Sequence, residues 1–415
     1  MYLPSFLRPL GALQLCMALS VPMQAAALTF EEALSTAEQT SPGLKAQSLS
    51  TRASREDSLA AGKLPDPRLV LGLQNLPVQG DNRGQINADG MTMQMVGLMQ
   101  EVPNRSRRAA ELALAEASTE RSEAEYRLMR LNVRLATADA WLQVHKIERQ
   151  LAQFGALFEQ NRVLAAAVDA RIRAGQGMLA DRPVAALERL MLDDRQDQLH
   201  SDLAQARATL RSWAGDAAGQ PTSGSWPQWH VDASLYRAQL NQQPALALYQ
   251  PLGRERQAGV ALAAADKRPD WSWELAYQRR AAGLNDMMSV QVSIGLPVFP
   301  GARQNRRLAA RELEVTGLAY ERELILRELI RELESALAER ERAERALERI
   351  RGGQLPLAAE RAELAFADYR GGRGSLEALV SARSQHIEAR LDEIERTAAV
   401  AVSHARLQLN FGEQP

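Results

Sequence analysis

The sequence predicts a mainly α-helical chain that carries membrane β-hairpins, and three observations lead to this fold class. Hydrophobic residues make up 46% of the 415 residues but aromatic residues only 5%, so small aliphatic side chains fill the apolar share. Charged residues contribute 24%, with 50 basic and 51 acidic side chains in near balance. This composition is typical of long helices and coiled coils. Short stretches in which apolar and polar residues alternate are the exception, and they predict strands.

Several classes of protein are excluded at this stage. The net charge of −1 provides no basic surface for nucleic acid. The one cysteine, Cys16, allows neither a disulfide framework nor a cysteine-based zinc site. After residue 30 no stretch stays apolar for the roughly 18 residues that a membrane-spanning helix requires. There is no phosphate-binding glycine loop and no G-x-S-x-G motif, so we expect no enzymatic activity, no catalytic residues and no cofactor.

Residues 1–27 have the pattern of a secretory signal peptide. Arg8 supplies the positive charge, residues 10–21 form a short apolar stretch, and Ala25 to Ala27 offer a cleavage site of small residues. The apolar stretch is too short to span a bilayer stably, which favours cleavage over an N-terminal anchor. The residues before Cys16 are not the small ones that a lipidation motif requires. We therefore expect an exported protein.

The remaining chain contains the same plan twice. The segment Arg173–Met178 recurs as Arg370–Ser375 at an offset of 197 residues, and Pro65-Asp66 recurs as Pro269-Asp270 at an offset of 204. The offset between matching segments changes only across loops. This is expected if one unit was duplicated and residues were later inserted in the loops. The chain is therefore divided into a first repeat, a linker rich in glycine and proline, and a second repeat, at 28–215, 216–232 and 233–415.

Each repeat is expected to run from a helix through a hairpin into two long helices. Thr29 is the expected N-cap of the first helix. The helix, two strands and two long helices of the first repeat are predicted at 28–62, 69–73, 91–100, 104–174 and 178–213. Those of the second repeat are predicted at 245–265, 271–278, 289–298, 302–369 and 375–411. At ~1.5 Å per residue, a single helix over 302–369 would be about 100 Å long, which no globular domain of this size needs.

The two hairpins supply four strands, each with one apolar and one polar face. Their length fits a transmembrane strand of ~9–11 residues, and tryptophan and tyrosine settle at membrane interfaces. The residues expected to face lipid are Leu71, Met93, Met95, Trp271, Trp273, Tyr277, Val292 and Ile294. The residues expected to face an aqueous lumen are Gln94, Gln100, Glu274, Gln278, Ser289, Gln291 and Ser293.

Four strands cannot close a barrel, because the smallest membrane barrels have about eight. A sheet in lipid must nevertheless close to satisfy its edges, so several chains are expected to contribute to one barrel. The alternative is that the hairpins cover a soluble cap, with one face buried on protein.

No metal-binding residues are expected. Met91, Met93, Met95 and Met99 alternate along one strand, and thioethers prefer Cu(I). On a face turned to lipid such ligands would be useless, so these methionines are assigned to packing. The five histidines show no paired spacing, and His145 and His404 are expected on helix surfaces.

The order helix, hairpin and long helical hairpin, duplicated in an exported chain, resembles the TolC-like outer-membrane efflux proteins over the whole mature chain. The segments Leu64–Val78 and Met91–Pro103, followed by Arg105, Arg107 and Arg108, look like the cobalt-zinc-cadmium (CzcC-like) branch. The resemblance implies a homotrimer whose chains share a twelve-stranded β-barrel in the outer membrane of a Gram-negative envelope, above a long periplasmic helical coiled-coil tunnel. It also implies a periplasmic adaptor and an inner-membrane resistance-nodulation-division (RND) pump as partners, and divalent heavy-metal cations as the exported substrate.

The same resemblance implies roles for the loops that join the long helices. These tip loops would form the entrance and meet the adaptor through Arg173, Gly175, Gln176, Gly177, Met178, Arg370, Gly372, Arg373, Gly374 and Ser375. The alternative is that they are only tight turns. Some channels of this family close the entrance with a ring of aspartates. The equivalent positions here are Ala378 and Ser381, so Asp181 and Glu377 are the candidate gate residues.

Two other functions remain open from the sequence. One is a soluble periplasmic coiled-coil adaptor or scaffold, and the other is a channel of the same fold that exports drugs or proteins. An adaptor would normally carry one helical hairpin flanked by half-lipoyl strands, whereas this chain has two hairpins in a duplicated plan.

Overall fold

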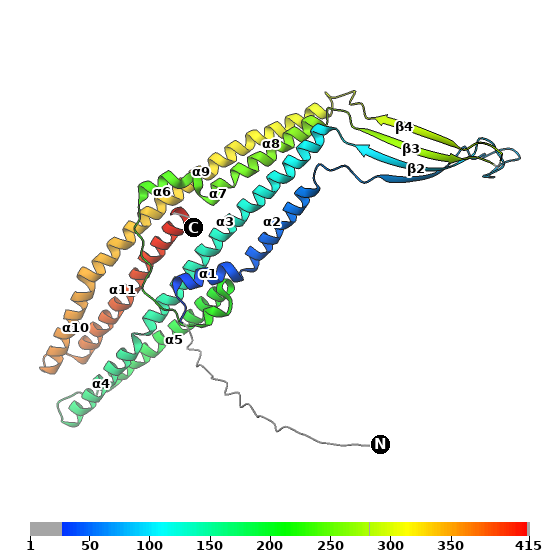
Figure 1. Cartoon of the computed structure of the whole chain (residues 1–415). Coiled ribbons are helices and arrows are strands. Elements are labelled where there is room, and N and C mark those ends of the chain that lie inside the picture. Colours follow the sequence, from blue (N-terminus) through cyan, green and yellow to red (C-terminus); the bar gives the residue numbers. More distant parts are fainter. Residues whose placement is uncertain (1–26, 282, 413–415) are drawn as a thin grey trace, which may run out of the picture.

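The computed structural model describes residues 27–281 and 283–412. A long helical body carries one β-sheet at one end and two helical hairpin tips at the other (Figure 1). The expected signal peptide lies outside the described residues, apart from its last position, Ala27. Among the residues described, no helix is both long and apolar enough to cross a membrane.

The elements follow the order that the sequence predicts. The first part of the chain contains α1 Phe30–Thr40, α2 Pro42–Ala60, β1 Arg68–Gln74, β2 Met93–Val102, α3 Arg105–Leu151, α4 Phe154–Arg173 and α5 Asp181–Ala214. The second part contains α6 Ala233–Gln239, α7 Pro244–Ala247, α8 Tyr249–Ala265, β3 Trp271–Arg279, β4 Met287–Ile294, α9 Gln304–Arg349, α10 Leu355–Arg370 and α11 Leu376–Phe411.

The start of α1 confirms the predicted cap. The backbone N–H of Glu32 donates to Thr29 Oγ1, and the backbone N–H of Thr29 donates to Glu32 Oε2 at 2.9 Å, which together form a capping box. The prediction of one helix over 28–62 is wrong, because the chain breaks at Ser41. Proline at position 42 disfavours helical backbone in the residue before it, and Ser41 becomes the N-cap of α2.

The two long predicted helices also show interruptions. The helix predicted over 104–174 is divided into α3 and α4 by a turn at residues 152–153. The helix predicted over 302–369 runs through α9 and α10, which are joined by one π-helical turn at Ile350–Gln354. Gly352 and Gly353 lie in this turn, where they add no side chain to the distorted backbone.

The main hydrophobic core lies where α1, α3, α5 and the segment after α5 meet. Trp141 and Phe154 are fully buried there, and Phe30 packs edge-on against the Trp141 ring. Trp226 and Trp229, from the predicted linker, pack against the same cluster. The linker is also fixed to the start of the chain, since the backbone N–H of Leu28 donates to the carbonyl oxygen of Pro221 at 2.9 Å.

His145 corrects the expectation of a histidine on a helix surface. It is 1% exposed and stacks on Trp141, with ring centroids 4.7 Å apart. Arg149 Nε donates to His145 Nε2, so the ring proton lies on Nδ1, which donates to Thr222 Oγ1 at 2.9 Å. The sequence could not show this, because Thr222 and Trp226 reach the site from the linker.

Candidate functional site

The four strands form one antiparallel sheet in the order β1-β2-β3-β4, so both halves of the chain contribute to it. Residues directly opposite each other on neighbouring strands share a face. The apolar face carries Leu69, Leu71, Leu73, Val96, Leu98, Trp271, Trp273, Leu275, Tyr277, Met288, Val290, Val292 and Ile294. The polar face carries Arg68, Gln74, Glu101, Ser272, Glu274, Gln278, Ser289, Gln291 and Ser293.

The register corrects the predicted faces of β2. Gln94 lies opposite Leu73, and Gln100 lies opposite Trp273, so both glutamines belong to the apolar face. Met93 and Met95 lie on the polar face. The predicted grouping of these two methionines with the apolar strand residues, and of the two glutamines with the polar ones, is therefore wrong.

The physical reason is that β2 has apolar residues on both of its faces. Val96 and Leu98 are in phase with Gln94, while Met93 and Met95 are in the opposite phase. A period of two then fits either orientation, and only pairing with β1 and β3 decides between them.

The remaining strand residues divide between the faces as the sequence grouped them. Leu71, Trp271, Trp273, Tyr277, Val292 and Ile294 share the apolar face. Glu274, Gln278, Ser289, Gln291 and Ser293 share the polar face.

The polar face is also the less exposed one along the two central strands. Gly97, Ala276 and Gln278 are buried on this face, whereas Val96 and Tyr277 beside them on the apolar face are about half exposed. This difference is expected of a coiled sheet whose polar face is concave. The apolar face is therefore the more exposed of the two.

A polar joint fixes the sheet to the helical body, and the sequence did not reveal it. Asp270, just before β3, accepts hydrogen bonds from the backbone N–H of Asn104 at 2.7 Å and from its side-chain amide at 2.8 Å. The guanidinium of Arg107 lies 3.2 Å from the second oxygen of Asp270. A hydrogen bond to Glu111 and the charge of Asp270 raise the pKa of Arg107. The joint connects the end of β2 and the start of α3 to the residue just before β3.

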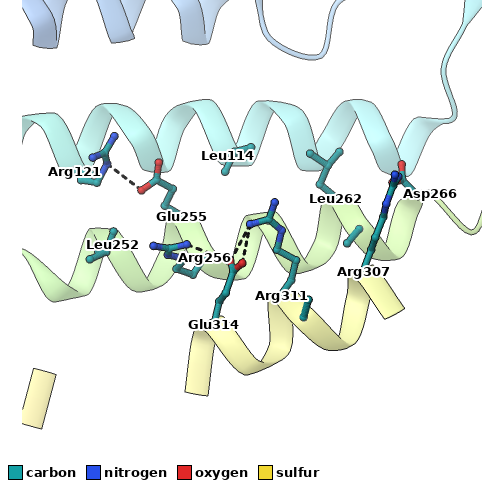
Figure 2. A pocket seen from close by; sticks show the side chains of 13 residues that line it. Leu114, Arg121, Leu252, Glu255, Arg256, Leu262, Asp266, Arg307, Arg311 and Glu314 are labelled. Atoms are coloured by element: carbon teal, nitrogen blue, oxygen red, sulfur yellow. Dashed lines mark hydrogen bonds and ion pairs between the residues drawn. The ribbon is translucent and has the colours of Figure 1, made fainter. Parts of the chain in front are cut away.

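A groove of about 680 Å³ lies between α3, α8 and α9 (Figure 2). The three acidic side chains that line it are each paired with an arginine, so none is left free to hold a cation. The pairs are Arg121–Glu255, Arg256–Glu314, Arg311–Glu314 and Arg107–Asp266, with N···O distances between 2.8 and 3.7 Å. This groove is therefore a charged packing surface rather than a substrate site.

The two tip loops lie at the end of the helical body farthest from the sheet (Figure 1). Gly175 and Gly372 both have left-handed backbone, with φ of +70° and +72°. A Cβ at either Gly177 or Gly374 would lie 3.1 Å from the preceding helix. The two loops therefore need glycine at equivalent positions and for the same reasons. Several polar side chains of the loops are exposed, namely Arg173, Gln176, Arg370, Arg373 and Ser375.

The tips of the two hairpins contact each other directly. Arg171 of α4 donates to the carbonyl oxygen of Tyr369 at the end of α10. Farther from the tips, the nearly buried carboxylate of Glu188 accepts a hydrogen bond from Asn161 at 2.8 Å and lies 3.7 Å from Arg383 of α11. These contacts couple the α4–α5 hairpin to the α10–α11 hairpin.

The two predicted gate residues have different surroundings. Asp181 Oδ2 accepts the backbone N–H of Met178 at 3.3 Å, so its carboxylate helps to close the first tip turn. Glu377 lines a cavity of about 1050 Å³ between α5 and α11, together with Glu188, Glu388, Asp392 and Glu395. Asp181 does not line this cavity. Within the described part of the chain, no group of three His, Cys, Asp or Glu residues is placed to bind a metal ion.

No protein-family profile matches the sequence, and no curated protein matches it either. Solved structures do match its fold. A membrane protein from Pseudomonas aeruginosa matches with a TM-score of 0.79 at 19% identity, covering 92% of this chain and 90% of that one. The outer membrane protein VceC from Vibrio cholerae matches at 0.75 and 15%, covering 92% and 96%. CusC, described as forming a transmembrane channel, matches at 0.75 and 16%, covering 99% of both chains.

These identities establish the fold alone. The chain has the fold of these membrane proteins, and its own mainly helical structure with four strands agrees with the fold class that the sequence predicted.

Proposed function

We propose that this protein is a TolC-like outer-membrane channel of a tripartite efflux system. The observation that carries the proposal is a four-stranded sheet, with one outward apolar face and two unpaired edges, at the end of a long helical body. The structural likeness to VceC and CusC supports it.

The apolar side chains of this face are more exposed than is usual on a protein surface in contact with water. Leu71 of β1 is 68% exposed, and Val290 and Ile294 of β4 are 71% and 59% exposed. Between these two edge strands the same face carries exposed side chains of β2 and β3, namely Val96, Leu98, Leu275 and Tyr277, so the apolar surface is continuous across the sheet. Patches of this kind mark contact with protein or membrane. Trp271 and Trp273, near the helical end of the sheet, suit the boundary between lipid and water. A soluble adaptor or scaffold is less favoured, because nothing else in the described chain covers this face.

The sheet edges favour a homotrimer. In the described chain β1 and β4 each pair on one side only, and unpaired backbone groups are not tolerated in lipid. Pairing β4 of one copy with β1 of the next would close a ring. Three copies would give twelve strands, with the polar face as the lumen. In this arrangement Glu274, Gln278, Ser289, Gln291 and Ser293 line the pore, together with Met93 and Met95.

The tip loops are the proposed entrance. Their exposed arginine and glutamine side chains can donate hydrogen bonds to an incoming adaptor, and an RND pump would supply the energy for a passive duct. Glu377, which lines the cavity between α5 and α11, is the stronger candidate for a gate, since Asp181 closes a turn. Exchange of Gly372 and Gly374 for leucine is expected to weaken adaptor-dependent export while trimers persist. Loss of trimers would instead assign the loops a structural role.

Divalent heavy-metal cations are the proposed substrate, and the similarity of the segments Leu64–Val78 and Met91–Pro103 to the cobalt-zinc-cadmium branch supports this choice. Cells that lack the gene would be challenged with zinc, cobalt, cadmium, copper and drugs. We expect lower tolerance of metals. Unchanged metal tolerance with lower drug tolerance would assign drugs as the substrate instead.

The processing and repeat structure are also proposals. We infer that cleavage after Ala27 releases a chain that starts at Leu28, which N-terminal sequencing of the purified protein would test. The repeats at 28–215 and 233–415, joined by 216–232, are supported by the equivalent glycine backbones of the two tips.

Membrane insertion and oligomer closure can be tested together. We expect the protein to require detergent for extraction, and recovery in the soluble periplasm would refute the channel. For closure, Cys16 is replaced by alanine and a cysteine is placed at Leu71 in β1. A second cysteine is then moved through positions 288, 290, 292 and 294 of β4. Oxidation should join chains into covalent trimers at one or more positions. The control keeps only the Leu71 cysteine, which should give no trimer.

A further inference from the structure

Methionine side chains gather on the polar face of the sheet. Met93, Met95 and Met99 lie on this face of β2, and Met287 lies on it in β4, opposite Gln278. The residues directly opposite them are small, polar or charged, namely Gln74, Gly72, Gln278, Arg68 and Glu274. Large apolar side chains are out of place on a face of this kind unless they have a specific task.

Met93 and Met95 are partly buried and lie among small and polar groups. Like all other residues of the sheet, they lie outside the hydrophobic clusters of the described chain. Met93 lies opposite Gln74, and Met95 lies opposite Gly72, over which its Cε atom extends. The Met95 sulfur accepts a hydrogen bond from the Gln74 side-chain amide at 3.4 Å. The sulfur of Met95 is therefore turned toward polar groups rather than into a core.

We propose that Met93 and Met95 form a two-thioether site for a soft monovalent cation, Cu(I) or Ag(I), on the lumen wall. Thioethers select soft cations over divalent zinc or cobalt. Residues two apart on a strand lie about 7 Å apart on the same face. Three rotatable bonds in each methionine let both sulfurs converge on one ion. To turn its sulfur to an ion, Met95 would exchange the weak hydrogen bond from Gln74 and the contact of its Cε atom with Gly72.

Further residues of the polar face continue the proposed site along β2. Met99, toward the helical end of β2, lies directly opposite Glu274. On the other side of Met99 lies Arg68 of β1, whose charge is paired with Glu101 at 3.2 Å. Among the described residues Glu274 has no ion-pair partner, so its carboxylate is available to attract a cation. Met91 lies beyond Met93 at the loop end of the strand, where it is exposed. A cation that moves along the sheet from its helical end toward its loop end would therefore pass the carboxylate of Glu274 first and the thioethers of Met95 and Met93 afterwards.

The inference rests on the proposed function, because the methionines are useful only if their face is the aqueous lumen. It deepens that function by adding soft monovalent cations to the substrates. Two neutral ligands form a weak site, and weak binding suits passage, since an ion must leave as readily as it enters.

The test uses the purified, detergent-extracted protein and Ag(I), which needs no reductant. Hydrogen peroxide oxidises accessible methionines, and peptide mass spectrometry reports each one separately. We expect Ag(I) to slow oxidation of Met93 and Met95 but not of Met288, an exposed methionine on the apolar face. Equal protection of Met288, or no protection of the pair, would overturn the proposal.

A variant series provides the second arm. Met93→Leu combined with Met95→Leu preserves side-chain volume. It should weaken Ag(I) binding by at least about tenfold, because even second-shell changes at metal sites cost about 10–100-fold. The matched control, Met288→Leu, should leave binding unchanged. Equal binding by both variants would refute the site. The cysteine cross-links between β1 and β4 are read out separately, so failure of the metal site and failure of the channel are distinguishable.

Discussion

Arg171 contacts Tyr369 in two ways across the two hairpin tips. Its guanidinium donates to the Tyr369 carbonyl oxygen at 2.8 Å, and its central carbon lies 4.4 Å from the centre of the Tyr369 ring. The two residues are separated by almost half of the chain. Tyr369 is 6% exposed, so this contact seals the core between the tips as well as joining them.

Arg171→Ala is therefore expected to loosen the second tip. A cation–π contact and a charged hydrogen bond together contribute about 1–2 kcal/mol. Amide hydrogen exchange in residues 366–376 should accelerate by about tenfold, while exchange near Trp141 stays unchanged. Arg173→Ala is the matched control, because Arg173 makes no contact of this kind in the described chain. Equal acceleration in both variants would contradict the role of Arg171.

Glu188 is expected to matter more than its exposed acidic neighbours. Its side chain is 6% exposed and serves both Asn161 and Arg383. Glu188→Ala leaves Arg383 without this carboxylate and Asn161 with only its bond to the Ala185 carbonyl oxygen, and it should destabilise the α4–α5 hairpin by about 2–3 kcal/mol. Glu188→Gln keeps an acceptor for Asn161, so its effect should be smaller. Hydrogen exchange in residues 157–192 measures both. Glu377→Ala, in the same cavity, should change little, and a larger effect there would contradict this account.

Because of His145, the folded protein is expected to lose stability as the pH falls. Burial and the adjacent charge of Arg149 lower the pKa of His145 to about 4, from an ordinary value near 6.5. The unfolded chain therefore binds the proton more tightly than the folded one. The contribution of neutral His145 is complete above a pH of about 6.5 and is lost as the pH falls toward about 4.

Thermal melts across this range would test the sign. The melting temperature of the wild-type protein should exceed that of His145→Gln near neutral pH, and the difference should narrow as the pH falls. His200→Gln, at an exposed position of α5, is the control and should show a constant difference. A His145→Gln difference that widens in acid would show that the histidine is charged in the folded protein.

Asp270 and Asp66 occupy equivalent Pro-Asp pairs but have unequal surroundings. Asp270 binds Asn104 and Arg107, whereas Asp66 makes no side-chain hydrogen bond or ion pair in the described chain. Asp270→Ala should therefore destabilise the joint between sheet and helices by about 1–3 kcal/mol, and Asp66→Ala should not. Limited proteolysis between β2 and α3 reports the joint. Similar cleavage rates in the two variants would contradict the role of the Asp270 contacts with Asn104 and Arg107.

Much of the fold could be predicted from local sequence. The strands follow from alternation in β3 and β4, the start of the first helix from Thr29 as its N-cap, and the tips from the repeated glycines. In each case the decisive signal lies within a few residues. The position of the tips opposite the sheet follows from the lengths of the long helices.

The errors arise where partners come from distant segments. The faces of β2 depend on its register with β1 and β3, because Val96 and Met95 are both apolar. His145 is buried by Trp226, and Asn104 is held by Asp270, which is 166 residues away in the sequence. Local periodicity contains no information about such partners, so the sequence pattern could not identify them.

The open edges of β1 and β4 have a genetic consequence. If a barrel needs every seam between copies, one defective copy disables the whole assembly. In the proposed trimer, equal expression of normal and edge-blocked chains with random mixing would leave only about one assembly in eight fully normal. Edge-blocking alleles should therefore be dominant, whereas alleles that prevent folding altogether should be recessive, because unfolded chains never enter an assembly.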